Sequence, residues 1–217
     1  MLSWTLLQLA DSALPTGGFA HSGGIEAAVQ LEEEGGGLAP FVAEALWQCG
    51  ATALPLAAAA HASPSRLAEL DLRCDAALPS HVANRASRLQ GQAFLRAAAA
   101  ACPAEVGPLL EQATAERWRC HLAPVFGAAL GLLGAPLEDA RRLLLYQTAR
   151  GILLAAVRLG VAGPLEAQRL LGELAGEAER VLRATAARGV DEVAATSPIL
   201  DLLQGHQERL YSRLFQS

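Results

Sequence analysis

The chain has 217 residues, of which 52% are hydrophobic and 18% are charged, and its net charge is −5. This length suits a single domain, which we expect to span residues 1–217. Alanine and leucine are abundant and β-branched residues are few, so the composition favours an all-α fold. All 17 basic residues are arginine, which excludes the lysine-dependent P-loop and pyridoxal-phosphate enzymes. The scattered arginines and the net negative charge also argue against nucleic-acid binding.

The cysteines and the longest apolar stretches bear on the compartment. The four cysteines form no CxxC pair, so we expect buried or free thiols in a reducing compartment. The most apolar stretches, at 122–133 and 152–157, are too short to cross a bilayer, and residues 1–10 lack the basic start of a signal peptide. These features favour a cytoplasmic protein that makes no contact with a membrane.

Helical periodicity, interrupted by glycine and proline, runs along nearly the whole chain and predicts one compact bundle of about eight to ten helices. Residues 11–19 are expected to be a loop, and the acidic and glycine-rich tract at 32–37 a turn. Pro55 is expected to break or kink the helix that contains it. The predicted helices cover 4–10, a restart near 22–24, 40–61, a start at 63–64, 80–102, 109–117, 123–133, 137–159 and 165–188.

The loop around Ser22 suggests two alternatives. In the first, Ser22 and His21 form the nucleophile and base of a small serine hydrolase. Against it, position 20 is Ala rather than Gly, no strand precedes the loop, and neighbouring side chains normally point apart. In the second alternative, Ser22 caps the free amides of the next helix, with Glu26 near the positive end of the helix dipole.

Five histidines and four cysteines also raise the possibility of a direct helical metal carrier. Two ligands on one helix face need a spacing of three or four residues, and no two of these residues have it. The pattern therefore favours isolated histidines and buried thiols, while a metal site assembled between subunits stays open.

Two helical faces carry residues that are typical of protein contacts. Arg85 and Arg88 lie three residues apart, and arginine makes bidentate contacts with carboxylates or phosphates. Arg142 and Tyr146 share a face of the long helix, a combination enriched at interfaces. The alternatives are a solvated face paired with nearby acids and a tyrosine half-buried on its own bundle.

Residues 197–217 are unusually apolar for a terminal segment. Leu210, Tyr211, Leu214 and Phe215 have helical spacing, which predicts a helix with an apolar stripe of Leu210, Leu214 and Phe215. The stripe is expected to dock either on its own bundle or, as the aromatic and arginine content favours, on a partner.

Four ordered segments resemble a known family, the urease accessory proteins called UreF. Residues 6–26, which include the loop sequence around Pro15, Gly17 and Phe19, look like the start of that family. Residues 81–91, 121–127 and 211–217 are similar to three later segments of the family. One departure is Gln207, which stands between His206 and Glu208, whereas family members often have the acid directly after the histidine.

The resemblance implies a non-catalytic adaptor that forms a homodimer, binds a scaffold protein called UreD or UreH and recruits the GTPase UreG. The assembly would deliver nickel to apo-urease, with nickel and GTP handled by the partners and no cofactor bound by this chain. Residues 1–26 would then be an N-terminal segment and loop, and 197–217 a partner-binding tail. The candidate partner-binding residues are Pro15, Gly17, Phe19, His21, Ser22, Glu26, Arg85, Arg88, Arg142, Tyr146, His206, Leu210, Tyr211, Arg213, Leu214 and Phe215.

Overall fold

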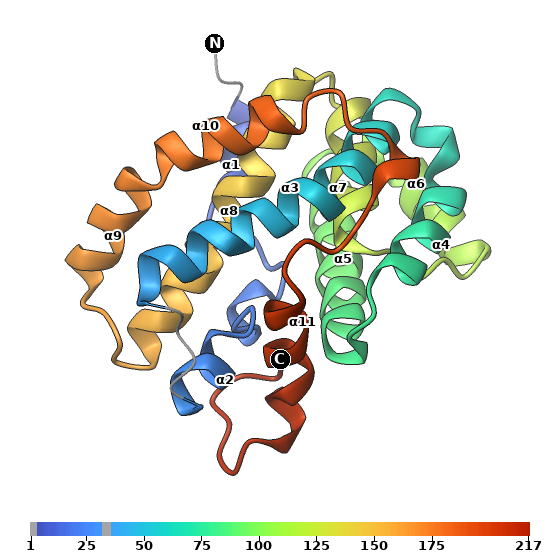
Figure 1. Cartoon of the computed structure of the whole chain (residues 1–217). Helices are drawn as coiled ribbons and strands as arrows, with labels where there is room; N and C mark the ends of the chain where they lie inside the picture. Colours follow the sequence, from blue (N-terminus) through green and yellow to red (C-terminus); the bar gives the residue numbers. More distant parts are fainter. Residues whose placement is uncertain (1–3, 32–35) are drawn as a thin grey trace.

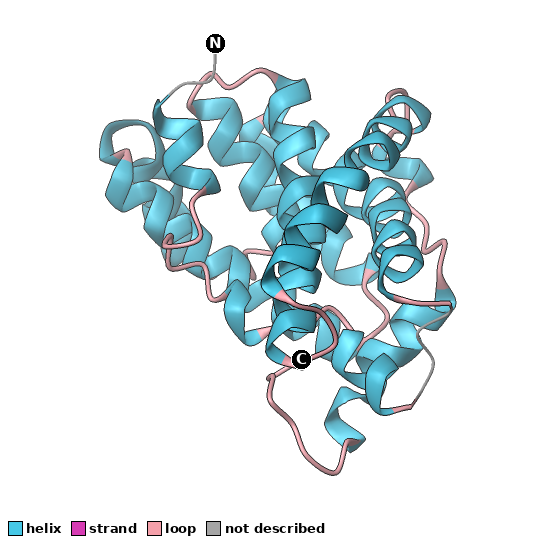
Figure 2. Cartoon of the chain, turned by 90° about the vertical axis from the view of Figure 1, so that its left-hand side faces the viewer, coloured by secondary structure: helices cyan, strands magenta, loops and turns pink. Residues whose placement is uncertain are grey.

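The computed structural model describes residues 4–31 and 36–217, and within them it contains helices and loops but no strand (Figures 1 and 2). The predicted all-α fold is therefore confirmed. The described residues form α1 (Trp4–Ala10), α2 (Ile25–Gln30), α3 (Leu38–Ala62), α4 (Leu67–Ala77), α5 (His81–Ala101), α6 (Pro103–Ala115), α7 (Leu122–Leu132), α8 (Leu137–Arg158), α9 (Pro164–Glu173), α10 (Ala175–Ala184) and α11 (Pro198–His206). Single 3-10 turns lie at η1 (Gly18–Ala20), η2 (Pro64–Arg66), η3 (Val190–Glu192) and η4 (Gln207–Arg209).

Helix α3 lies at the centre and packs against both α7 and α8, and one hydrophobic core joins residues from α1 to Phe215. The α3 and α7 backbones approach closely because α7 carries glycine on the facing side. A Cβ atom built on Gly127 would lie well under 3.0 Å from the backbone of Ala57, and one on Gly131 would crowd the carbonyl oxygen of His61. Glycine is therefore the side chain that this helix contact requires.

Of the two outcomes expected at Pro55, a break or a kink, the break is wrong, because α3 continues through this residue to Ala62. A proline inside a helix has no N–H to donate to the carbonyl four residues earlier, which here belongs to Ala51. The backbone N–H of Ala194, in the loop between η3 and α11, donates to that carbonyl oxygen at 3.4 Å. A residue distant in sequence thus satisfies the acceptor that Pro55 leaves free.

Three smaller differences concern helix ends and starts. The helix predicted at 165–188 is divided at Leu174 into α9 and α10, between Gly172 and Gly176, whose low helix propensity weakens the segment. The helix predicted from residue 109 already begins at Pro103, where proline occupies the first turn. Most of the turn predicted at 32–37 lies outside the described residues.

The helix predicted in the C-terminal segment is also wrong for its last residues. Helix α11 ends at His206, η4 ends at Arg209, and residues 210–217 form no helix. The predicted stripe does not exist, because Phe215 is buried, Leu210 is partly buried and Leu214 is exposed. In Figure 1 the red C-terminal segment instead returns beside the blue α2, so it docks on its own bundle.

We predict that Gly127→Ala lowers the free energy of unfolding by about 1–3 kcal/mol, because the new methyl group would overlap the Ala57 backbone. Gly151→Ala in α8 is the matched control, since nothing lies within 4 Å of its Cβ position. It should leave stability unchanged or raise it by about 0.5–1 kcal/mol through helix propensity. Urea denaturation measures both. Equal effects of the two substitutions would contradict the close contact of α3 and α7.

Candidate functional site

A buried carboxylate near the start of α2 organises the candidate site. Gly23 and Gly24 precede this helix with φ angles of +65° and +93°, a conformation that favours glycine. They turn the chain so that Glu26, in the first turn of α2, points inward, where only 1% of its surface is exposed. A buried carboxylate requires hydrogen-bond donors or a cation to offset its lost hydration.

The C-terminal segment supplies those donors. The backbone N–H of Leu214 donates to Glu26 Oε1 at 2.6 Å, and the N–H of Phe215 donates to Oε2 at 3.2 Å. The side-chain amide of Gln207, which is also fully buried, donates to Oε2 as well. Charge-assisted hydrogen bonds of this kind are about twice as strong as neutral ones. Glu26 therefore fixes both ends of the segment 207–217.

Further hydrogen bonds join the same two parts of the chain, and we call residues 18–30 and 207–217 together the terminal junction. The N–H of Ser22 donates to the carbonyl of Ser217 at 2.5 Å, and the N–H of Gln216 donates to the carbonyl of Ala20 at 2.8 Å. His21 Nδ1 and Ser217 Oγ are hydrogen-bonded at 2.5 Å. Burial, followed by the charge of Arg85, lowers the pKa of His21, so this imidazole is neutral at pH 7.

Arg158, at the end of α8, also connects the two segments. Its guanidinium lies 4.0 Å from the ring centre of Phe19 and 4.2 Å from that of Phe215, one ring from each side of the terminal junction. It also donates to the carbonyl of Phe19. Such cation–π contacts stabilise by about 0.5–2 kcal/mol each. Arg158 is not among the residues predicted from the sequence, because both of its aromatic partners lie far away along the chain.

Glu208 ties the terminal junction to α5. Its carboxylate lies 2.7 Å from Arg85 Nη1 and 2.8 Å from His81 Nε2, and hydrogen bonds from His81 and Arg85 lower the pKa of Glu208. Arg85 thus binds an acid of its own chain. Arg88 lies three residues further along α5 and makes no hydrogen bond or ion pair with any residue that the structure describes.

The structure does not form the Ser22–His21 pair of a hydrolase. Ser22 is fully buried, and its Oγ accepts a hydrogen bond from the N–H of Gly24 at 3.2 Å, while His21 pairs with Ser217. The capping alternative is partly correct. Ser22 satisfies an amide just before α2, but the N-cap residue itself is Gly24.

Most of the candidate residues gather at or beside the terminal junction. Pro15 and Gly17 are exposed in the loop before it, and His206 is half-buried at the end of α11. Three hydrophobic side chains of the junction face solvent: Phe19 is 68% exposed, Leu214 is 52% exposed and Tyr211 is fully exposed, next to the exposed Arg213.

Arg142 and Tyr146 lie apart from this group, in the first half of α8. Arg142 is 16 positions from Arg158, which corresponds to about 24 Å along a helix. Its Nε lies 2.6 Å from Glu179 of α10, and its Nη1 lies 3.4 Å from Asp139. Arg142 therefore joins α8 to α10, whereas Tyr146 is 42% exposed.

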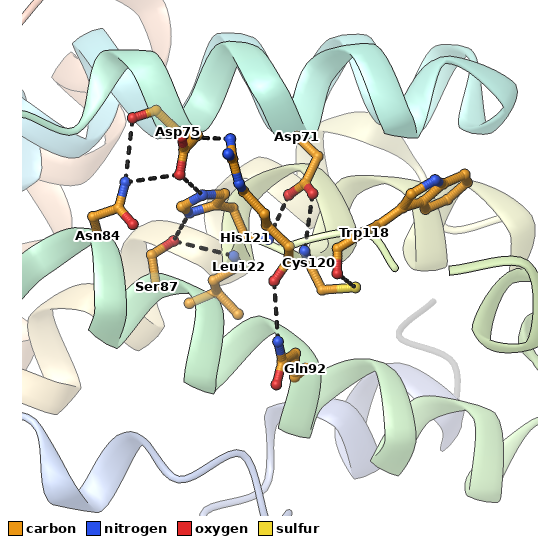
Figure 3. A network of polar contacts seen from close by, with 10 residues as sticks. Asp71, Asp75, Asn84, Ser87, Gln92, Trp118, Cys120, His121 and Leu122 are labelled. Carbon is orange, nitrogen blue, oxygen red and sulfur yellow. Dashed lines mark hydrogen bonds and ion pairs between the residues drawn. The ribbon is translucent and has the colours of Figure 1, made fainter. Parts of the chain in front are cut away.

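A second polar cluster fixes the start of α7 (Figure 3). The buried Asp71 of α4 accepts the backbone N–H groups of Cys120 at 2.9 Å and His121 at 2.6 Å, immediately before α7 begins. The imidazole of His121, with no exposed surface, lies between Asp75, 3.1 Å from Nε2, and Ser87, 3.1 Å from Nδ1. No local spacing in the sequence reveals this cluster, because its members come from α4, α5 and the segment just before α7.

The protonation states in this cluster follow from its contacts. Burial alone would raise the pKa of Asp75. Hydrogen bonds from Asn84 and His121 and the charge of Arg119 together lower this pKa by more than burial raises it, so the net shift is downward. Burial lowers the pKa of His121 despite the opposing effect of Asp75. An ionised Asp75 beside a neutral His121 places the proton on Nε2, and Nδ1 then accepts from the Ser87 hydroxyl. Ser87 in turn accepts the N–H of Leu122 at 3.2 Å.

Two further findings concern metal and membrane binding. Within residues 4–31 and 36–217, no group of three or more His, Cys, Asp and Glu side chains is arranged to hold a metal ion. In the same ranges no helix is both long and apolar enough to span a membrane.

Comparison with known proteins identifies the family. The UreF family model matches residues 34–175. The chain belongs to the UreF family. It is 40% identical to urease accessory protein F of Oryza sativa subsp. indica, over 98% of this chain and 84% of that protein. It is 37% identical to urease accessory protein F of Arabidopsis thaliana, over 100% of this chain and 93% of the relative, and 34% identical to urease accessory protein UreF of Mycobacterium tuberculosis, over 94% of each.

We predict that Glu26→Ala releases the C-terminal segment, because the N–H groups of Leu214 and Phe215 lose their acceptor. Each buried donor left without an acceptor costs about 1–3 kcal/mol of stability. Limited trypsin cleavage after Arg209 and Arg213 should become at least about tenfold faster. Glu111→Ala, on the exposed face of α6, is the matched control and should not change the rate. Unchanged cleavage of the Glu26 variant would refute the role of this carboxylate.

We also predict that the protein loses stability as the pH falls through about 6.5, the ordinary pKa of histidine. The pKa values of His21 and His121 are lower in the folded chain than in the unfolded chain, so the unfolded chain takes up protons first. At lower pH the lowered pKa of Asp75 adds a further loss. Urea denaturation at several pH values measures the slope, which His121→Asn should reduce. An identical slope in the variant would contradict the assignment.

Proposed function

We propose that this UreF-family chain is a non-catalytic adaptor in urease maturation. In this proposal it binds the UreD/UreH scaffold protein and the UreG GTPase, and the assembly inserts nickel into apo-urease in a GTP-dependent step. The observation that carries the proposal is the terminal junction, where buried Glu26 holds residues 207–217 against α2 and leaves Phe19, Tyr211 and Leu214 in solvent. The names of the relatives, which are urease accessory proteins, support the same assignment.

The chemistry of the chain is consistent with a division of labour between proteins. With no lysine anywhere in its sequence, the chain has no P-loop residue to hold a nucleotide phosphate, so the partner GTPase would bind GTP. Nickel would likewise be handled by the partners. The four cysteines are free thiols, as is usual for proteins that act in the reducing cytoplasm.

The exposed part of the terminal junction has the composition of a protein contact. Aromatic side chains and arginine are enriched at the centres of interfaces, and here Phe19, Tyr211 and Arg213 are exposed together with Leu214. Because Glu26 and Arg158 already hold the backbone of this segment, binding would cost little further backbone entropy. We assign this surface to the UreD/UreH scaffold.

To test this assignment, we predict that Tyr211→Ala combined with Leu214→Ala weakens capture of purified UreD/UreH by at least about tenfold. Both side chains are mainly in solvent, so circular dichroism and the melting temperature should stay those of the unmodified chain. Leu165→Ala, at an exposed position of α9, is the control and should bind normally. Point substitutions are preferable to removing 207–217, because deletion would leave Glu26 buried without its donors. Full-strength capture by the double variant would place the scaffold site elsewhere.

We further propose that two copies of the chain associate through the first half of α8. Since Arg142 is engaged by Glu179 and Asp139, the exposed Tyr146 would provide the contact between copies. We predict that Tyr146→Asp shifts the mass measured by light scattering from dimer to monomer, whereas Leu89→Asp, at a similarly exposed position of α5, does not. A monomeric unmodified chain at micromolar concentration would remove this proposal.

A further inference from the structure

A partly enclosed cavity of about 240 Å³ lies among α3, α4, α5, α7 and α8. Its walls are mostly apolar, with alanine at many positions, including Ala53, Ala77 and Ala86. His21 and Ser217, which are hydrogen-bonded to each other, also line it, so the terminal junction forms part of the wall. Neither the family assignment nor the proposed adaptor function uses this space.

The size and chemistry of the cavity indicate an occupant. Protein interiors are normally packed without voids much larger than a water molecule. An engineered apolar cavity of about 150 Å³ stays dry and binds benzene, and this cavity is larger. Polar side chains also line the cavity, but most of its surface is apolar. The hydroxyls of Thr52 and Thr148 donate to carbonyls of their own helices, and that of Ser87 is hydrogen-bonded to His121. Few polar groups on the walls are therefore free to bind water, so an apolar molecule is favoured over solvent.

The groups on the walls also select against charged ligands. Among the described residues that line the cavity, none is Asp, Glu or Arg. Cys49 and Cys74 both reach it, and burial raises the pKa of Cys49 to about 11 and that of Cys74 to about 12, so both thiols are neutral at pH 7. A charged ligand would lose its hydration here without gaining an ionic partner.

From these observations we propose that the cavity is a binding site for a small apolar organic molecule, of the size of one or two aromatic rings. A single polar group on the ligand would face His21 and Ser217, and the hydrocarbon part would lie against the alanines of α3, α4 and α5. The proposal does not depend on the adaptor function, since it concerns the interior of the isolated chain.

The experiment uses indole as the probe, benzoate as a charged probe of similar size, and the full chain. Indole should raise the melting temperature in a saturable manner and give a binding isotherm by calorimetry, and benzoate should do neither. Ala86→Leu places a larger side chain in the cavity and should weaken indole binding at least tenfold. Ala100→Leu introduces the same side chain on the exposed face of α5 and should bind indole like the unmodified chain.

A second measurement keeps the test independent of how the variants fold. In the unmodified chain, indole should shift the methyl resonances of Leu56 and Val82, which line the cavity, and leave those of Val106, buried at α6, unchanged. Absence of indole binding, equal binding by Ala86→Leu, or shifts confined to methyl groups outside the cavity would each overturn the proposal.

Discussion

The buried carboxylate of Glu26 is the constraint on which the candidate site depends. It is almost fully removed from water, and its hydrogen bonds come from Gln207 and from the backbone of Leu214 and Phe215, nearly the whole chain length away. A charge in this position is tolerated only if those donors stay in place. Satisfying Glu26 therefore brings the C-terminal segment to α2, and the exposed surface of the terminal junction is a consequence.

The structure separates three regions of the chain that differ in chemistry. The terminal junction presents aromatic and apolar side chains over a hydrogen-bonded base. The first half of α8 presents Tyr146 beside an arginine already paired within its own chain. The interior contains a cavity bounded in part by His21 and Ser217. Because His21 and Ser217 belong to both the cavity wall and the terminal junction, a molecule bound in the cavity would also stabilise the terminal junction.

Helices were predictable from the sequence because their signals are local. Apolar spacing, acids in first turns and Gly160 after α8 all act within a few residues of each other. The conformation of residues 210–217 was not predictable in this way. Their leucine and aromatic spacing suits a helix, but their backbone N–H groups bond instead to Glu26 and Ala20. Only the folded chain brings those acceptors close.

The same reason explains the other differences. Pro55 is tolerated within α3 because Ala194 donates to the carbonyl that proline leaves free, and no local pattern announces that contact. The candidate list contained Glu26 but omitted Arg158, since an arginine at a helix end is ordinary and its two aromatic partners lie far away in sequence. The sequence thus indicated which residues belong to the candidate site, whereas the contacts between them could be found only in the three-dimensional structure.

The most direct test of this account is hydrogen–deuterium exchange of the full chain, alone and saturated with purified UreD/UreH. Exchange is measured peptide by peptide across the whole chain. The account predicts slower exchange on binding within residues 18–30 and 207–217, with little change in α9 and α10. Unchanged exchange in those two segments, together with new protection on another face, would contradict the claim that the terminal junction is the scaffold-binding surface.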